Sequence, residues 1–400
     1  MQNSLLHFEE ESRLVTSTSA VVLPSEAAAA GRVFAESMKR EEGRTELLVA
    51  HSGEKGSEAL AEAFAAGAAS SGADCVFAGA CCATAAAYAA RELGCAGGCY
   101  VHTEITASFR LFGSDGLPLS GETEAHIEKH LGTVSRIPYS HYGKMSRFMG
   151  ADRIYSESIR KLLPVKLNGI NAVVSSSSPS VLGCCDMILE DKNDRLGDRL
   201  SFHISGDGMR ISVYTEETGY VFREKLVLLC LRDLFEKGID AAVCGRPFRA
   251  AEKLAEQYGR KIISCHKSIC SPESRASGDC IKARKLSSEQ LFMQDGIALM
   301  ASTLEILSRS GKTLGEEIAK LPPCVTVNRF IPADSPSELL KKLCTGTDDG
   351  LVSDSTGGRV VIRPVRTGKG IMLSVESYAS ETANELCDFY TELAAAGGRR

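Results

Sequence analysis

A serine followed at close range by an arginine forms the first stretch able to do chemistry. Ser108 follows the strand-forming run 99–105 and small residues, where a backbone can approach a phosphate closely. Arg110 lies two residues further on, and its guanidinium can neutralise a phosphate. Because arginine stays protonated at working pH, it is a poor general base. The backbone around Ser108 can therefore approach an anion closely, and an ordinary serine in a short turn is the alternative.

A second stretch combines cations with glycines. Residues 363–370 hold two arginines, a lysine, a threonine and two glycines, with the anion-binding candidates at Arg363, Arg366, Thr367, Gly368 and Lys369. Bidentate side-chain donors and backbone amides can both contribute in such a turn, so we predict an anion-binding site. An exposed basic hairpin turn explains the same pattern nearly as well.

The stretch around Ser108 resembles the phosphoserine loop of the α-D-phosphohexomutases, the phosphoglucomutase/phosphomannomutase family, whose pattern runs roughly ITASHNPxxxNGxKhFGSDG. Residues 105–108 match its start and residues 112–116 match its end. Several family positions in between are missing, and Arg110 stands where the family places a lysine. The resemblance implies that Ser108 is a phosphoryl acceptor and that Arg110 is a catalytic partner.

The metal loop of that family reads DGDxDR, with three carboxylates at alternate positions. The matching stretch is 205–210, in which only Asp207 keeps a carboxylate. Mg²⁺ prefers oxygen ligands, whereas a methionine sulfur is soft and a serine hydroxyl is neutral. The resemblance implies a weakened Mg²⁺ site at Asp207 with Ser108, and a phosphate contact from Arg210. The ligand set favours the alternative, a plain Gly-Asp-Gly turn between two strands.

Two further family motifs are incomplete. The sugar-recognition pattern GGExSGH has no counterpart ahead of residues 295–297, although their Asp-Gly-Ile predicts a helix start. The distal-phosphate pattern RPSGTEPxxR keeps its arginine at Arg363, its proline and its threonine. It loses the acidic residue and gains positive charge at Arg366 and Lys369. The resemblance therefore implies that this phosphate-binding turn is the best preserved of the four sites.

Strand and helix patterns alternate roughly every 20 residues in the first part of the chain, which predicts a layered α/β domain with a largely parallel sheet. The resemblance covers most of the chain and implies three consecutive α/β/α domains plus a C-terminal α+β domain around a central cleft. We predict boundaries that give domains at 1–150, 151–238, 239–323 and 324–400. Residues 138–150 read as a linker.

Composition excludes several other classes of protein. A net charge of −5 and a pI near 6.0 give no reason to expect nucleic acid as a partner. We expect no membrane association, because no apolar run approaches the roughly 20 residues of a transmembrane helix. Fifteen cysteines without a C-x-x-C spacing favour reduced, structural thiols and a cytoplasmic location.

Three hypotheses for function follow. The first is a degenerate phosphohexomutase that binds a hexose phosphate or similar phosphorylated molecule with weak or no turnover. The second is an active mutase that transfers a phosphoryl group through Ser108 with Mg²⁺ as cofactor. The third is a non-catalytic regulatory partner of an intact mutase. A homodimer is compatible with the sequence but not required by it. The loss of two metal-loop carboxylates favours the first hypothesis.

Overall fold

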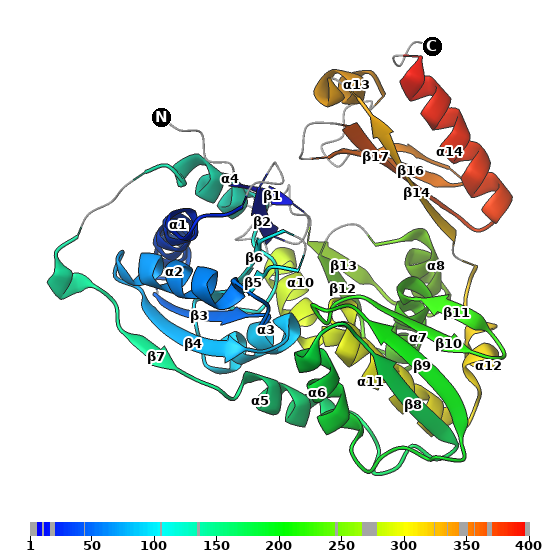
Figure 1. Ribbon diagram of the computed structural model, residues 1–400. Coiled ribbons are helices and arrows are strands. Elements are labelled where there is room, and N and C mark those ends of the chain that lie inside the picture. Colours follow the sequence, from blue (N-terminus) through cyan, green and yellow to red (C-terminus); the bar gives the residue numbers. More distant parts are fainter. Residues whose placement is uncertain are drawn as a thin grey trace.

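Four α/β units follow one another along the chain in the computed structural model (Figure 1). The structure describes residues 6–9, 12–16, 21–43, 45–104, 106–133, 137–244, 247–265, 278–323, 325–333, 335–343, 351–355, 357–365 and 370–396. Among these residues, no helix combines the length and the apolar character needed to cross a membrane.

The first unit is built on a seven-stranded sheet in the order β1-β2-β6-β5-β3-β4-β7. Its strands are β1 (Leu6–Glu9), β2 (Arg13–Thr16), β3 (Glu46–His51), β4 (Asp74–Ala80), β5 (Gly97–His102), β6 (Ser108–Gly113) and β7 (Met145–Arg147). Its helices are α1 (Pro24–Glu42), α2 (Ser57–Ala69), α3 (Ala83–Glu92), α4 (Gly121–His130) and the 3₁₀ turn η2 (Tyr139–His141). Strands β5, β3, β4 and β7 run parallel, and β6, β2 and β1 are added antiparallel at the other side.

Both faces of this sheet are buried, which explains the continuous apolar runs of its central strands. Helices α1 and α2 pack on one face of the sheet, against strand residues such as Leu47 and Phe109. Helix α3 packs on the other face, against Leu48 and Phe112. Helices α1 and α2 approach closely at Gly67, where a Cβ atom would lie 1.9 Å from the Ala28 carbonyl oxygen.

The second and third units share one hydrophobic core. The second contains α5 (Ala151–Arg160), β8 (Ile170–Ser175), α6 (Pro179–Leu189), β9 (Asp198–Ile204), β10 (Ile211–Thr215), β11 (Gly219–Phe222) and α7 (Arg223–Glu236). The third contains β12 (Ala241–Cys244), α8 (Arg249–Gln257), β13 (Ile262–Cys265), α10 (Gly278–Glu289), η3 (Leu291–Met293), α11 (Gly296–Ser310) and α12 (Leu314–Ile318). Helix α11 is apolar and buried along most of its length, so it forms the centre of this shared core.

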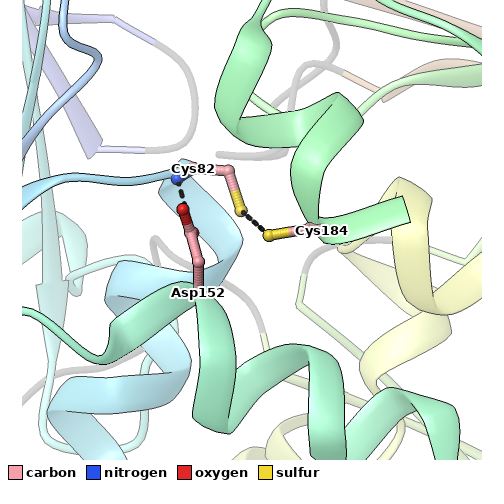
Figure 2. A group of neighbouring side chains, drawn as sticks. All are labelled: Cys82, Asp152 and Cys184. Carbon is pink, nitrogen blue, oxygen red and sulfur yellow. Dashed lines mark hydrogen bonds between the residues drawn. The ribbon is translucent and has the colours of Figure 1, made fainter. Parts of the chain in front are cut away.

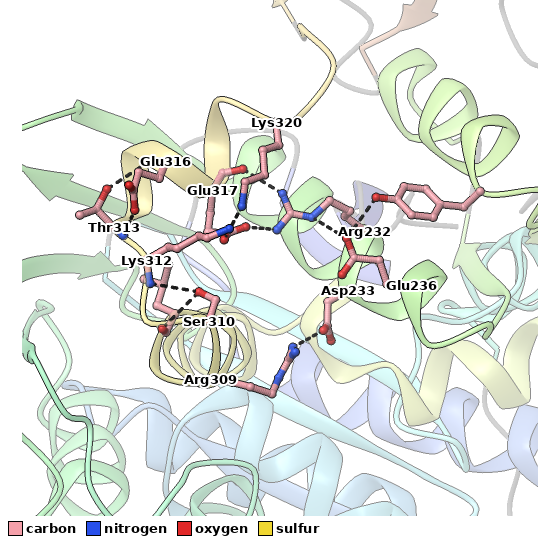
Figure 3. Close-up of polar contacts among 12 residues, drawn as sticks. Arg232, Asp233, Glu236, Arg309, Ser310, Lys312, Thr313, Glu316, Glu317 and Lys320 are labelled. Atoms are coloured by element: carbon pink, nitrogen blue, oxygen red, sulfur yellow. Dashed lines mark hydrogen bonds and ion pairs between the residues drawn. The ribbon is translucent and has the colours of Figure 1, made fainter.

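A buried ion pair links α7 to α12 (Figure 3). Arg232 and Glu317 expose only 7% and 3% of their side chains. Arg232 Nη1 donates to the Glu317 carbonyl oxygen at 3.0 Å, and its Nη2 contacts the Glu317 carboxylate. Lys320 Nζ lies 2.7 Å from the other carboxylate oxygen, Oε1. The Glu317 carboxylate is therefore held between two cations.

The C-terminal unit is an antiparallel sheet in the order β14-β17-β16-β15, packed against two helices through a single core. Its elements are β14 (Val325–Pro332), α13 (Pro336–Leu343), β15 (Leu351–Asp354), β16 (Arg359–Pro364), β17 (Gly370–Ser377) and α14 (Ser380–Ala395). Arg359 joins it to the third unit, since Nη2 lies 2.6 Å from Glu252 Oε2 and Nη1 donates to Pro247 O at 2.8 Å.

The expected fold class is confirmed: the chain is a series of α/β units followed by an α+β unit. The boundaries near residues 150, 238 and 323 stay predictions. Two details differ from the sequence analysis. Residues 145–147 of the expected linker form β7, which extends the sheet beside β4. The hairpin of β1 and β2 was not expected, because each strand is only four residues long.

Candidate active site

The stretch 205–210 is a tight turn between β9 and β10. Ser205 N donates to Arg210 O at 3.0 Å, and Gly208 N donates to Ser205 O at 2.9 Å. Gly208 has φ +82°, and a Cβ atom there would lie 3.2 Å from Thr84 Oγ1. The positive φ favours glycine at this position, and a Cβ atom would in addition crowd Thr84. The turn is also fixed to the third unit, because Gly296 N at the start of α11 donates to Gly208 O at 2.9 Å.

The single carboxylate of this turn, Asp207, is already engaged. Its Oδ2 lies 3.0 Å from Arg110 Nη2, and its Oδ1 accepts from Ser205 Oγ at 2.5 Å and from Met209 N at 3.1 Å. Burial pushes the pKa of Asp207 upward, but Arg110 and these hydrogen bonds outweigh burial and hold the pKa below its usual value. Asp207 is therefore an ionised anchor for Arg110, which is expected to compete with any cation.

The donor set of this turn does not fit Mg²⁺. The alternate positions 205, 207 and 209 carry a hydroxyl, a carboxylate and a thioether, in that order, whereas Mg²⁺ requires hard oxygen ligands. The Ser205 hydroxyl also accepts from Arg210 N at 2.9 Å, so it serves to close the turn.

Ser108 lies in the sheet and not in the turn that precedes it. It is the first residue of β6, is 7% exposed, and pairs with His102 of β5 on one side and Val15 of β2 on the other. Ser108 and Arg110 share a face of β6, because side chains alternate along a strand. The structure therefore brings Ser108, Arg110 and Asp207 into one region, with the serine largely covered.

Three side chains of the first unit gather at the ends of β3 and β5. His102 Nδ1 lies 3.4 Å from Glu54 Oε2, and His102 Nε2 lies 3.5 Å from Glu104 Oε2. Glu104 also approaches the 205–210 turn, since its Oε2 would lie 4.0 Å from a Cβ atom on Gly206. The sequence analysis did not identify Glu54 or His102. Their positions in the sequence could have indicated them, because Glu54 follows one apolar strand of the predicted parallel sheet and His102 ends another.

Asp295 begins helix α11, as its Asp-Gly-Ile pattern predicts. Its Oδ1 accepts from Ile297 N at 2.8 Å and Ala298 N at 3.0 Å, and its Oδ2 accepts from Tyr155 Oη at 2.6 Å. Burial raises the pKa of Asp295 to about 6, although these three hydrogen bonds oppose the shift.

Asp295→Asn is expected to change the pH dependence of stability. A carboxyl with a raised pKa in the folded state favours folding when protonated, so its contribution is lost as pH rises from about 4 to about 6. Asparagine is neutral throughout and still caps the helix. The difference in unfolding free energy between the variant and wild type should therefore shift in favour of the variant by on the order of 2–3 kcal/mol as pH rises from 4 to 7.5. Urea unfolding at both pH values measures this difference, and a difference independent of pH would contradict it.

The predicted phosphate-binding residues are only partly placed. Arg363 lies in β16 and is exposed, and Arg210 is exposed at the end of the 205–210 turn. Residues 366–369, which carry Arg366, Thr367, Gly368 and Lys369, lie outside the described residues.

A pair of cysteines joins the first unit to the second (Figure 2). Cys82 Sγ, just before α3, lies 3.7 Å from Cys184 Sγ of α6, and Asp152 of α5 accepts from Cys82 N at 3.1 Å. The hydrogen bond with Cys184 and burial both raise the pKa of Cys82. These residues are neutral thiols at a packed contact, in line with structural cysteines.

Two adjoining cavities lie along α3. The first, about 70 Å³, is lined by residues including Thr84, Arg110 and Asp295. It is smaller than the roughly 300–1,000 Å³ of typical ligand pockets. The second, about 590 Å³, is lined by Arg91, whose guanidinium already donates to Ser288 O and contacts Glu92. Neither cavity offers an uncommitted cation for a phosphate among the described residues.

Comparisons with known proteins agree with this architecture. Residues 17–136 match the family model of phosphoglucomutase/phosphomannomutase, alpha/beta/alpha domain I. A probable phosphoglucosamine mutase of Methanopyrus kandleri is 24% identical over 370 residues, covering 74% of this chain and 80% of that protein.

Solved structures share the fold over nearly the whole chain. The putative phosphomannomutase of Thermus thermophilus superimposes with a TM-score of 0.71 at 18% identity, covering 98% of this chain and 100% of that one. A variant of the Aspergillus fumigatus N-acetylphosphoglucosamine mutase, in complex with glucose 1,6-bisphosphate, gives a TM-score of 0.52 at 12% identity, covering 100% and 97%. The chain therefore has the multi-domain fold of these solved structures. Residues 17–136 are thus similar to domain I of the phosphoglucomutase/phosphomannomutase family, and the archaeal relative supports the same family for the chain.

Proposed function

We propose that this chain is a degenerate phosphohexomutase, which binds a phosphorylated sugar with weak or no turnover. The observation that carries the proposal is the state of the metal loop. Its one carboxylate, Asp207, is paired with Arg110 at 3.0 Å, and no second carboxylate exists at positions 205 or 209.

Phosphoryl transfer depends on positioning and on neutralising the charge of the transferring group. A family member that transfers through serine needs an accessible hydroxyl beside a bound dication. Ser108 is 7% exposed and is hydrogen-bonded into a strand between β2 and β5. Both requirements are weakened together, which supports binding over catalysis.

Retained cations support the binding of a phosphorylated ligand. Arg210 and Arg363 are both exposed. The segment 366–369 adds Arg366 and Lys369 in the sequence. The glucose 1,6-bisphosphate of the distant fungal neighbour makes a hexose phosphate the first ligand to test. The same proposal includes a cytoplasmic location, in keeping with nine buried free cysteines among the described residues.

An active mutase is the second candidate. Glu54, His102 and Glu104 favour it, because they bring two carboxylates and an imidazole to the edge of the same turn. Transfer would then depend on a metal site different from the family loop.

Incubation with a hexose 1,6-bisphosphate and Mg²⁺, followed by intact mass and peptide mapping, separates the two candidates. We expect no phosphate on Ser108 and a raised melting temperature when the bisphosphate is present. The Ser108→Ala variant is the matched control, and it should bind as wild type does. A phosphate on Ser108 would establish the second candidate. A melting temperature unaffected by the phosphosugar would contradict binding itself.

A further inference from the structure

The sheet of the first unit changes winding direction between β3 and β5. From β3 the chain passes through α2 on one face to β4, and from β4 it passes through α3 on the opposite face to β5. Strand β3 is thus flanked by β4 and β5, whose connections lie on opposite faces. In open parallel sheets, ligands bind outside the carboxyl ends of the strands at such a point.

Three potential metal ligands lie there. Glu54 follows the end of β3, His102 is the last residue of β5, and Glu104 lies two residues beyond. One ligand atom from each can be chosen so that all lie within 4.8 Å of one another. A dication at their centre would be neutralised by the two carboxylates, and water or a phosphate oxygen can complete its coordination.

Glu54 is oriented by its surroundings. Its Oε2 accepts from Thr103 N at 2.8 Å and from Ser52 Oγ at 3.0 Å. Such outer hydrogen bonds fix the direction of a ligand carboxylate and are a regular part of metal sites. Because Ser52 and Thr103 follow β3 and β5 directly, the two strand ends hold the carboxylate from both sides.

Two buried polar atoms near this point have no hydrogen-bond partner among the described residues. His102 Nδ1 is buried and makes no hydrogen bond of acceptable geometry, although Glu54 lies close. The Tyr100 hydroxyl is also unpartnered, in a residue that is 1% exposed. Tyr100 shares a face of β5 with His102.

We propose that Glu54, His102 and Glu104 bind a divalent first-row transition metal ion, such as Mn²⁺, beside the 205–210 turn. The mixed imidazole and carboxylate donors suit Mn²⁺ or Zn²⁺ better than Mg²⁺, which takes oxygen ligands. Metal binding here requires neither sugar binding nor turnover, so it stands or falls separately from the proposed function.

Titration of the full chain with Mn²⁺, followed by electron paramagnetic resonance of the free ion, tests the site. We expect one Mn²⁺ per chain in the wild type. Glu104→Gln and His102→Gln should each weaken binding by at least about tenfold, since even the loss of an outer partner can have that effect. Glu104 is half exposed, so its variant is expected to fold. Equal melting temperatures without metal would verify this.

Two variants act as matched controls for other binding positions. Asp207→Asn removes the carboxylate of the family loop, and Cys184→Ser removes a thiol of the Cys82 cluster. Both should leave Mn²⁺ affinity within about threefold of wild type, a change of under 1 kcal/mol. The proposal is overturned if wild type binds no Mn²⁺, if either control abolishes binding, or if Mg²⁺ competes as strongly as Mn²⁺ itself.

Discussion

Glu317→Ala is expected to lower the unfolding free energy by about 3–5 kcal/mol, because it leaves the buried guanidinium of Arg232 without its carboxylate. Arg232 is 7% exposed, and its contacts with Glu317 include both the carboxylate and the carbonyl oxygen. Figure 3 shows Arg232 and Glu317 facing each other. Denaturant unfolding of wild type and variant measures the difference.

Glu236→Gln is the matched control. Glu236 lies 3.4 Å from Arg232 Nε, but its side chain is 48% exposed, so its loss should cost less than about 1 kcal/mol. The double variant Arg232→Met with Glu317→Leu removes both charges and should recover most of the loss. A cost below about 1 kcal/mol for Glu317→Ala would show that water solvates Arg232 in the folded protein.

The same pair contributes to stability with a defined pH dependence. Burial raises the pKa of Glu317, but Lys320 and Arg232 outweigh burial and lower the pKa below its usual value. A carboxyl of this kind stabilises the fold above its unfolded pKa and loses that contribution as pH falls through the folded pKa. The effect of Glu317→Ala should therefore shrink in acid.

Restoring the family metal loop is expected to create Mg²⁺ affinity. Ser205→Asp with Met209→Asp yields three carboxylates at alternate positions around the same glycines. Charge count is a main determinant of affinity for hard cations. Two added charges within a few ångströms of a dication should strengthen Mg²⁺ binding by at least about 100-fold, even at an effective dielectric constant near 20. Isothermal titration calorimetry of the double variant and wild type measures this gain.

Arg110 competes with Mg²⁺ for the Asp207 carboxylate, so a variant that also lacks Arg110 is the control for this experiment. Arg110 pairs with Asp207 at 3.0 Å, so the same double substitution combined with Arg110→Ala should bind Mg²⁺ more tightly still. Without metal, the added carboxylates should lower the melting temperature, because like charges then crowd a tight turn. If the double variant gains no affinity for Mg²⁺, a geometric defect of the turn, beyond its lost charges, must prevent binding.

Much of the architecture could be predicted from local sequence. Strands such as β3 and β4 are short apolar runs next to turn residues, and α11 begins at an Asp-Gly-Ile that caps its own helix. The Gly-Asp-Gly between β9 and β10 is a turn, as its composition indicates. These features depend on residues within a few positions of one another, so the chain alone determines them.

The site, in contrast, was decided by tertiary structure. Glu54 and His102 are 48 positions apart, and they meet only because β3 and β5 are neighbours in the sheet. Arg110 of the first unit contacts Asp207 of the second, 97 positions further along the chain. Ser108 lies at the start of β6, where it pairs with Val15 of β2 and His102 of β5. Strand order and the packing of one unit on another set these contacts, and local composition does not encode either.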